Sequence, residues 1–188
     1  MNRSPDRPLV GVYPGTFDPL TVAHVAIARA ALDQLSLERI DLTISASTLG
    51  KDDAALTPID ERLAELERIC ADDARFGVRS TDHSLLVDVA AGYDVLVLGG
   101  DKWAQVLDPD WYGGVAARDD ALRRLPMVAL APRHPWTTLD ADARTEVLGD
   151  GAVGVEVVLL ELDPAHREVS ATAVRAGRTE WRARPTQR

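Results

Sequence analysis

The residues best suited to chemistry in this sequence lie in one stretch near the N-terminus, YPGTFDPLTVAH at residues 13–24. The stretch follows an apolar run at residues 9–12 that is typical of a buried strand, and it leads into an alanine-rich segment with helical periodicity. Because a helix start carries unpaired N–H groups and the positive end of the helix dipole, a loop at this point suits phosphate. Thr21 and His24 lie three residues apart on the first helical turn, so both side chains can face the same anion.

The glycine spacing of this stretch differs from two common phosphate-binding patterns, G-x-G-x-x-G and G-x-x-x-x-G-K-[ST]. It resembles instead the G-[TS]-F-D-P-x-[HT]-x-G-H signature of the nucleotidylyltransferase superfamily, with Ala23 in place of the second glycine. The resemblance implies that Gly15, Thr16 and Phe17 receive a nucleotide. An ordinary turn between a strand and a helix is the alternative, because glycine and proline are frequent in all turns.

A second stretch near the C-terminus, VSATAVR at residues 169–175, resembles the I-S-[ST]-[ST]-x-x-[RK] motif of the same superfamily. Ser170 is predicted to cap a helix, and Ala171 stands where the motif usually has a hydroxyl. The resemblance implies that Ser170 and Thr172 lie at the nucleotide and that Arg175 holds its β and γ phosphates. A capped helix with a surface arginine is the alternative.

A third segment, G-G-D at residues 99–101, follows a strongly apolar run. Together with a downstream tryptophan it resembles the G-[AG]-D…W segment of nicotinate/nicotinamide mononucleotide adenylyltransferases. The resemblance implies that Gly100 and Asp101 contact the nucleoside and that Trp111 lies by the acceptor. The spacing to Trp111 is longer here than in that segment, and core packing of both Trp103 and Trp111 is the alternative.

Two cations outside these motifs also match the superfamily. Lys51 lies in a polar, irregular stretch at residues 47–56, and TPIDER at residues 57–62 follows it, which is similar to the lysine and T-x-x-E-R pattern of several branches. A loop lysine can close over a phosphate as a point charge, although a solvated surface lysine is the alternative. Arg133 follows an apolar run at residues 127–130 and resembles a positively charged acceptor loop of the same adenylyltransferases.

Together these resemblances imply an enzyme that transfers AMP from ATP to the phosphate of a small acceptor and releases pyrophosphate. In that reaction His24 would meet the α and β phosphates, and Thr21 would hydrogen-bond the transferring or acceptor phosphate. Lys51 and Arg175 would neutralise the remaining negative charge. Mg²⁺ is expected to arrive bound to the triphosphate, so no dedicated metal site is predicted in the protein.

The sequence favours two possible acceptors. The second motif, the G-G-D segment and Arg133 favour nicotinate or nicotinamide mononucleotide, which would place the protein in NAD biosynthesis. The start of the chain, with Thr21 where many relatives have a histidine, also resembles phosphopantetheine adenylyltransferase of coenzyme A biosynthesis. A third reading, a protein that binds nucleotide without turnover, is motivated by Ala23, Ala171 and the altered loop at residues 47–56.

The elements that must position these residues alternate between strands and helices, which predicts an α/β fold: a Rossmann-like, doubly wound parallel sheet with helices on both faces. Thr57 is predicted to cap a helix that starts at Pro58. The other predicted helices are residues 21–35, 85–91, 115–124, 141–148 and 168–175, and the predicted strands are 9–12, 40–46, 76–80, 94–98, 127–130 and 155–160. Sheets of this kind bind ligands beyond the carboxyl ends of their strands, where both glycine turns are expected.

Length and composition predict one domain, because 188 residues with 46% hydrophobic and 27% charged content are ordinary for a globular protein. Residues 1–7 and about 178–188 are expected to be flexible ends. The net charge of −9 argues against a nucleic-acid partner, and no apolar run reaches membrane-spanning length. Cys70, the only cysteine, is predicted to pack in the core and fits a reducing cytoplasm. The expected partners are small nucleotides, with a homo-oligomer left open.

Overall fold

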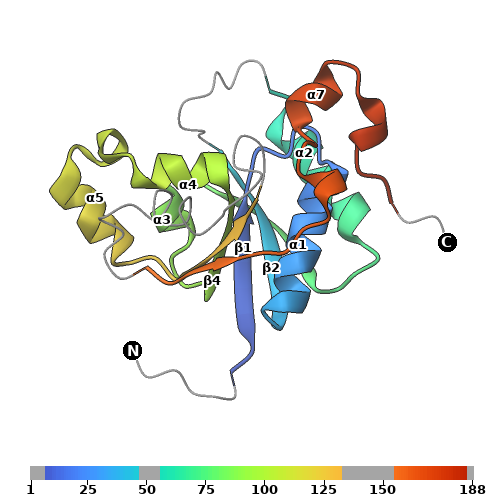
Figure 1. Cartoon of the computed structure of the whole chain (residues 1–188). Coiled ribbons are helices and arrows are strands. Elements are labelled where there is room, and N and C mark those ends of the chain that lie inside the picture. The colour runs from blue at the N-terminus through green and yellow to red at the C-terminus, as the bar shows by residue number, and fades with distance from the viewer. Residues whose placement is uncertain (1–6, 47–55, 133–154, 186–188) are drawn as a thin grey trace.

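A six-stranded parallel sheet lies at the centre of the computed structural model, which describes residues 7–46, 56–132 and 155–185 (Figure 1). From one edge to the other the strands are β3 (Phe76–Thr81), β2 (Leu37–Ser45), β1 (Leu9–Pro14), β4 (Val95–Gly99), β5 (Met127–Ala131) and β6 (Val157–Leu159). The strand order reverses its direction between β1 and β4. In open parallel sheets this switch point is where ligands bind, just beyond the carboxyl ends of the strands.

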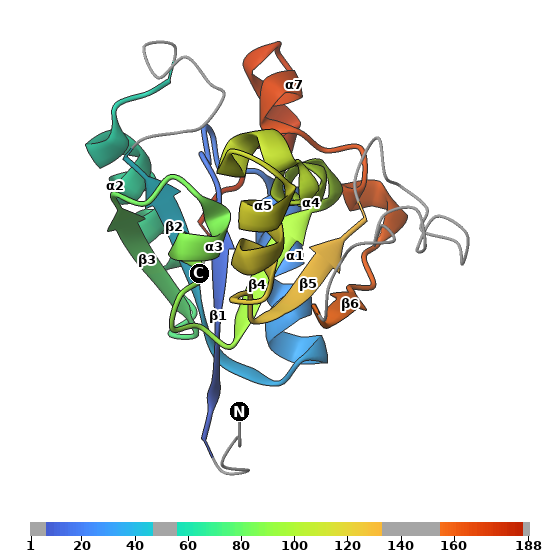
Figure 2. The same ribbon diagram turned by 90° about the vertical axis from the view of Figure 1, so that its left-hand side faces the viewer.

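Helices cover both faces of the sheet. On one face lie α1 (Val22–Gln34) and α2 (Ile59–Cys70), and on the other lie α3 (Leu86–Val89), α4 (Gly100–Leu107) and α5 (Val115–Leu122), as Figure 2 shows. A short last helix, α7 (Ala171–Arg175), lies beside the start of α1 (Figure 1). This arrangement confirms the predicted Rossmann-like, doubly wound fold.

The sequence of β4 explains how both faces are held. Val95 and Val97 belong to the apolar cluster beneath α1 and α2, whereas Leu96 and Leu98 belong to the cluster beneath α3, α4 and α5. Successive side chains of a strand point to opposite faces, so a strand that is covered on both sides must be apolar throughout. All residues of β4 are buried, as the apolar run predicts.

Two predictions about single elements are wrong. No helix is predicted at residues 100–107, yet α4 begins directly after β4 and buries Trp103 and Val106, three residues apart, against the sheet. Thr57 does not cap α2: the N-cap is Pro58, without a side-chain hydrogen bond, because the Thr57 hydroxyl is used elsewhere.

The flexible C-terminal end expected from about residue 178 stays a prediction, and the structure describes a folded segment there as far as residue 185. A 3-10 turn (Thr179–Trp181) is followed by extended residues that pair with the start of α1. The predicted strand at residues 155–160 is shorter in the structure, as β6. The predicted helix at residues 141–148 lies outside the described residues.

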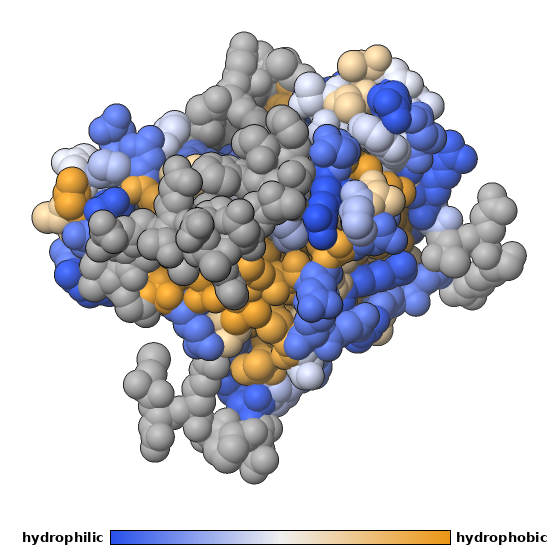
Figure 3. Space-filling model, viewed as in Figure 1, coloured by the Kyte–Doolittle hydropathy of each residue, from blue (hydrophilic) through white to orange (hydrophobic). Residues whose placement is uncertain are grey.

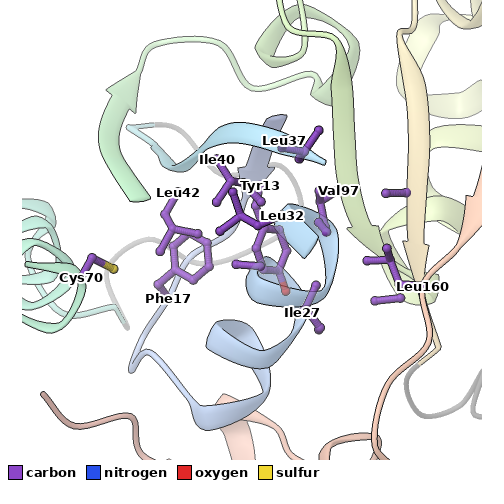
Figure 4. Close-up of a cluster of buried hydrophobic side chains, with 14 of the residues drawn as sticks. Tyr13, Phe17, Ile27, Leu32, Leu37, Ile40, Leu42, Cys70, Val97 and Leu160 are labelled. Carbon is purple, nitrogen blue, oxygen red and sulfur yellow. The ribbon is translucent and has the colours of Figure 1, made fainter. Parts of the chain in front are cut away.

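Cys70 lies in the core between α1 and α2 (Figure 4), as predicted. Burial raises the pKa of its thiol to about 11, which keeps the thiol protonated and unreactive at neutral pH.

On the face seen in Figure 3, hydrophilic residues lie at both sides and apolar residues gather near the centre. Within the described residues no helix has the length and hydrophobicity needed to cross a membrane.

Candidate active site

The first motif forms the loop that joins β1 to α1. Its start continues the sheet, because the N–H of Gly15 donates to the carbonyl of Thr43 on β2 at 3.0 Å. A Cβ atom at Gly15 would lie 2.8 Å from the ring of Phe17, which is closer than carbon atoms approach. Glycine is therefore required for the loop to fold tightly over that ring.

Phe17 points into the protein and is only 1% exposed. Its ring packs edge-on against Tyr13, at 5.5 Å between centroids, and against His24, at 5.2 Å, and it lies in the apolar cluster drawn in Figure 4. The sequence analysis places Phe17 at the nucleotide. The structure shows that the residue is buried and that its ring forms the floor beneath the loop, so the ring is not placed to contact a ligand.

Thr21 and His24 form a reciprocal cap at the start of α1. The Thr21 hydroxyl accepts from the N–H of His24 at 3.3 Å, and the N–H of Thr21 donates to Nδ1 of His24 at 3.1 Å. Because a backbone N–H can only donate, Nδ1 must accept, and the proton of the neutral imidazole is therefore on Nε2. The cap fixes the tautomer that presents an N–H donor from the far side of the ring.

Thr21 itself is fully buried. Its hydroxyl lies 3.0 Å from Nδ1 of His24 as well as accepting from the His24 N–H. A direct hydrogen bond from this hydroxyl to a phosphate, as the sequence analysis expects, would require the cap to open. In the observed geometry Thr21 orients His24 instead.

The second motif meets the first in space. The Arg175 guanidinium donates to the carbonyl of Asp18, which lies 157 positions earlier in the chain, and to the hydroxyl of Thr172 at 3.3 Å. Ser170 caps α7 as predicted, accepting from the N–H of Ala173 at 3.1 Å. The exposed Arg175 side chain therefore lies directly against the loop that leads to His24.

A network beneath the first motif was not predicted from the sequence. The buried carboxylate of Asp18 accepts from the N–H of Thr57 at 3.1 Å and from its hydroxyl at 2.8 Å. Arg62, which is 7% exposed, donates through Nε to the carbonyl of Thr57 at 2.7 Å and through Nη1 to the carbonyl of Thr16 at 2.9 Å. These bonds tie the loop at both ends to the start of α2.

A pocket opens beside this loop at the carboxyl ends of β1, β2 and β3. Its lining combines polar residues with apolar and aromatic ones. The polar residues are Gly15, Thr16, Thr43, Ser45, Thr81, Ser84, Lys102 and Gln105, and the apolar and aromatic residues include Leu85, Leu86, Val89, Val106, Trp111 and Tyr112. The pocket also reaches α4, which follows β4, so it adjoins the switch point of the sheet, where the fold predicts a ligand.

The two tryptophans after β4 have different surroundings. Trp103 is 1% exposed and packs in the core, whereas Trp111 is 36% exposed and lines the pocket. Core packing is therefore the right reading for Trp103, and Trp111 is available to a ligand. Gly100 is buried at the start of α4 and Asp101 is exposed there, and neither residue lines the pocket.

Two predicted site residues, Lys51 and Arg133, lie outside the described residues. Within residues 7–46, 56–132 and 155–185, no three His, Cys, Asp or Glu side chains are placed to hold a metal ion together. The donors around the first loop are amides, hydroxyls and an imidazole, which suit phosphate oxygens better than a hard cation.

The fold is that of a Rossmann-like protein, with the first motif and the pocket beyond the carboxyl ends of its parallel strands. The chain belongs to the cytidylyltransferase-like family, whose model matches residues 12–177. That match includes both motifs and ends shortly after Arg175.

Individual relatives agree with this family. The chain is 38% identical over 73 residues to a probable nicotinate-nucleotide adenylyltransferase of Neisseria meningitidis, covering 39% of this chain and 36% of that protein. It is 34% identical over 96 residues to a phosphopantetheine adenylyltransferase of Ruegeria, covering 48% and 55%. These matches thus span between a third and just over half of the curated relatives' lengths. The fold is similar to that of the nicotinic acid mononucleotide adenylyltransferase of Plasmodium falciparum, with a TM-score of 0.64, 12% identity, and coverage of 90% of this chain and 83% of that one.

Proposed function

We propose that this protein is an adenylyltransferase that transfers AMP from ATP to the phosphate of nicotinate or nicotinamide mononucleotide. The observation that carries the proposal is the contact of Arg175 with Asp18, which joins the second motif to the loop that leads to His24. Membership of the cytidylyltransferase-like family supports nucleotidyl transfer, and the Neisseria relative supports this acceptor.

The proposed reaction is a displacement at the α-phosphorus of ATP. A phosphate oxygen of the acceptor forms the new P–O bond, the bond from the α-phosphorus to the bridging oxygen breaks, and pyrophosphate leaves. Because the acceptor phosphate is already an anionic nucleophile, neither a covalent enzyme intermediate nor a strong base is needed. The protein must position the two substrates and neutralise charge.

Each residue of the site is assigned to a different part of the substrates. The loop at Gly15 and Thr16 would receive the nucleotide, while the Nε2–H of His24 would donate to the α and β phosphates. Arg175 would hold the β and γ phosphates, with Ser170 and Thr172 beside it. Gly100 and Asp101 at the nucleoside, and Lys51 over the phosphates, remain proposals that rest on the family resemblance.

We also propose Mg²⁺ as the metal that the triphosphate brings with it. Mg²⁺ keeps several waters and is commonly bound through substrate phosphates and few protein groups. Bound in this way, it would neutralise part of the charge on the leaving pyrophosphate.

The pocket beside the loop suits a mononucleotide acceptor. Trp111 and Tyr112 offer flat surfaces on which a pyridine ring can stack, and Thr43, Ser45 and Thr81 also line the pocket. Arg133 would add a positive charge on the acceptor side. A pantetheine arm, which is flexible and has no aromatic ring, would use the two aromatic residues less well.

The acceptor can be tested directly by pyrophosphate release with purified protein, ATP and Mg²⁺. Nicotinate or nicotinamide mononucleotide is expected to support faster release than 4′-phosphopantetheine. Trp111→Ala should raise the KM for the mononucleotide about two- to tenfold while the KM for ATP changes little, since an aromatic stacking contact contributes about 0.5–1.5 kcal/mol. Trp111→Phe is the matched control and should lose less.

The reverse order of acceptors would favour a phosphopantetheine adenylyltransferase, the second candidate, which the Ruegeria relative and the threonine at position 21 support. Binding of ATP without pyrophosphate release from any acceptor would favour a protein that binds nucleotide without turnover.

The role of Arg175 can be tested by comparing ATP with AMP, which lacks the β and γ phosphates. Arg175→Ala is expected to weaken ATP binding about 10- to 100-fold and AMP binding hardly at all, because a hydrogen bond to a charged group contributes about 1.5–3 kcal/mol. Arg123→Ala, at an exposed arginine of α5, is the control and should change neither affinity. Equal losses for the two nucleotides by calorimetry would remove Arg175 from this role.

Three expectations from the sequence keep the status of proposals. We propose that residues 1–188 form a single domain, that the protein acts in the cytoplasm, and that its partners are small nucleotides rather than nucleic acid. A homo-oligomer stays open. Sedimentation of the purified protein measures the oligomeric state.

A further inference from the structure

The segment that follows the second motif lies against the start of α1. This segment, residues 178–183, begins one residue after the family model ends at residue 177. The N–H of Ala183 donates to the carbonyl of Leu20 at 2.9 Å, and Arg182 and Thr21 form an antiparallel bridge. Its main chain therefore pairs with the residue that caps α1 and with the residue before it.

Side chains anchor the segment on both sides of this pairing. Ala183 is 5% exposed and belongs to the apolar cluster beneath α1 and α2. The Arg182 guanidinium donates to the Glu65 carboxylate of α2 through two nitrogens, at 3.0 and 2.7 Å. At the start of the segment the Arg178 guanidinium lies 4.1 Å from the ring centre of Trp181, which holds the turn in shape.

The pairing acts on the group that fixes His24. Thr21 donates its N–H to Nδ1 of His24 and accepts from the His24 N–H, so any tilt of the Thr21 main chain moves the imidazole. Leu20 and Thr21 have no other strand beside them in the described part of the chain, because β1 ends at Pro14 and α1 begins at Val22. The segment supplies the missing partner.

We propose that residues 178–183 are a positioning element for His24: by pairing with Leu20 and Thr21 they hold the cap that sets the tautomer and direction of the imidazole. The proposal rests on the proposed function for its effect on rate, and on the structure alone for its effect on the histidine ring. Arg182 and Ala183 are positioning residues in this sense, since neither touches a substrate.

The experiment displaces the segment in the full-length chain. Ala183→Asp places an unpaired carboxylate at a buried position, which should drive the segment off α1. Ala117→Asp makes the same change at an exposed position of α5 and is the matched control. Because misplacing a catalytic group by about 1 Å can cost as much as about 10²-fold, Ala183→Asp is expected to lower kcat by about 10- to 100-fold with the KM for ATP nearly unchanged.

A milder variant keeps the test informative if Ala183→Asp does not fold. Arg182→Ala removes only the contact with Glu65 and should lower kcat by a few-fold, and Glu65→Ala should have the same effect. The double variant should be no worse than either single one, because both changes break the same link. Additive losses, or unchanged kcat in a folded Ala183→Asp protein, would overturn the proposal.

A second readout does not depend on turnover. Nitrogen NMR of the imidazoles should show His24 in the wild-type protein with its proton on Nε2, and a mixture of tautomers in Ala183→Asp but not in Ala117→Asp. The sequence has four histidines, so the His24 signal is assigned by its loss in His24→Gln. If the wild type releases no pyrophosphate with any acceptor, the proposed function fails, whereas an unchanged His24 tautomer in Ala183→Asp overturns the positioning role.

Discussion

His24→Ala is expected to lower kcat by about 10²–10³-fold, with little change in the KM for ATP, because one preorganised donor to developing charge contributes about 2.7–4 kcal/mol. The donor is the Nε2–H that the cap with Thr21 presents from the start of α1. A hydrogen bond that strengthens as charge moves onto the phosphates lowers the barrier without tightening the ground state.

Steady-state pyrophosphate release measures this effect, and circular dichroism checks that the fold is kept. His166→Ala, at a histidine outside both motifs, is the control and should keep full activity. Thr21→Val should give a smaller defect of the same kind, since it removes the hydroxyl from the cap but leaves the backbone donor to Nδ1. Near-full kcat in His24→Ala would show that the chemistry takes place elsewhere.

Arg62→Met is expected to lower the free energy of unfolding by about 2–3 kcal/mol, because hydrogen bonds to a charged group contribute about 1.5–3 kcal/mol each. The change removes both donors to the carbonyls of Thr16 and Thr57 while it nearly keeps the side-chain volume. Thr57 is exposed, so water can replace one of the lost donors, which limits the loss. Removing the buried charge of Arg62 also removes the cost of desolvating that charge, which offsets part of the lost stability.

Urea denaturation measures the free energy of unfolding of Arg62→Met and of the control Arg68→Met, which changes an exposed arginine on the same helix. The free energy of unfolding of Arg68→Met should lie within about 0.5 kcal/mol of the wild-type value. Arg62→Lys should recover only part of the loss, because a single ammonium cannot reach two carbonyls in the fixed fork of a guanidinium. A wild-type midpoint in Arg62→Met would mean that the loop is held without these bonds.

The fold could be predicted because its signals are local. β4 is apolar throughout, α1 follows a glycine and proline turn, and Ser170 stands where a helix cap is expected, and each of these features appears in the structure. α4 escaped prediction because its start coincides with the glycines that end β4, so the same residues serve as strand end and helix start.

The candidate site could be predicted only in part, because its contacts join distant residues. Nothing in the sequence around Asp18 shows that its carboxylate binds Thr57, and nothing around Arg62 shows that it reaches Thr16. The signal that could have indicated this network is an arginine at a position of α2 that faces the core. The burial of the Phe17 ring could not be predicted either, since an aromatic residue in a polar loop gives no sign of the direction in which it points.

The C-terminal segment, residues 178–183, shows that amino-acid composition alone does not predict whether a segment is ordered. Its arginines and polar residues resemble those of a disordered tail, yet the pairing with Leu20 and Thr21 uses main-chain groups that any residue carries. Only the small buried side chain of Ala183 is specific to the packed state. Composition predicts how much surface a segment can bury, but it does not show whether a neighbouring backbone lacks a partner.

The central place of β1 in the sheet has a consequence for how the molecule is made. β1 leaves the ribosome before the other strands, but β4, its neighbour on one side, follows only after β2 and β3. During synthesis at about 5–20 residues per second, one edge of β1 therefore stays open for several seconds, and an open edge can pair with other chains. The contact of Arg175 with Asp18 forms later still, so a nascent chain that has completed most of its sheet cannot yet hold a triphosphate in the proposed way.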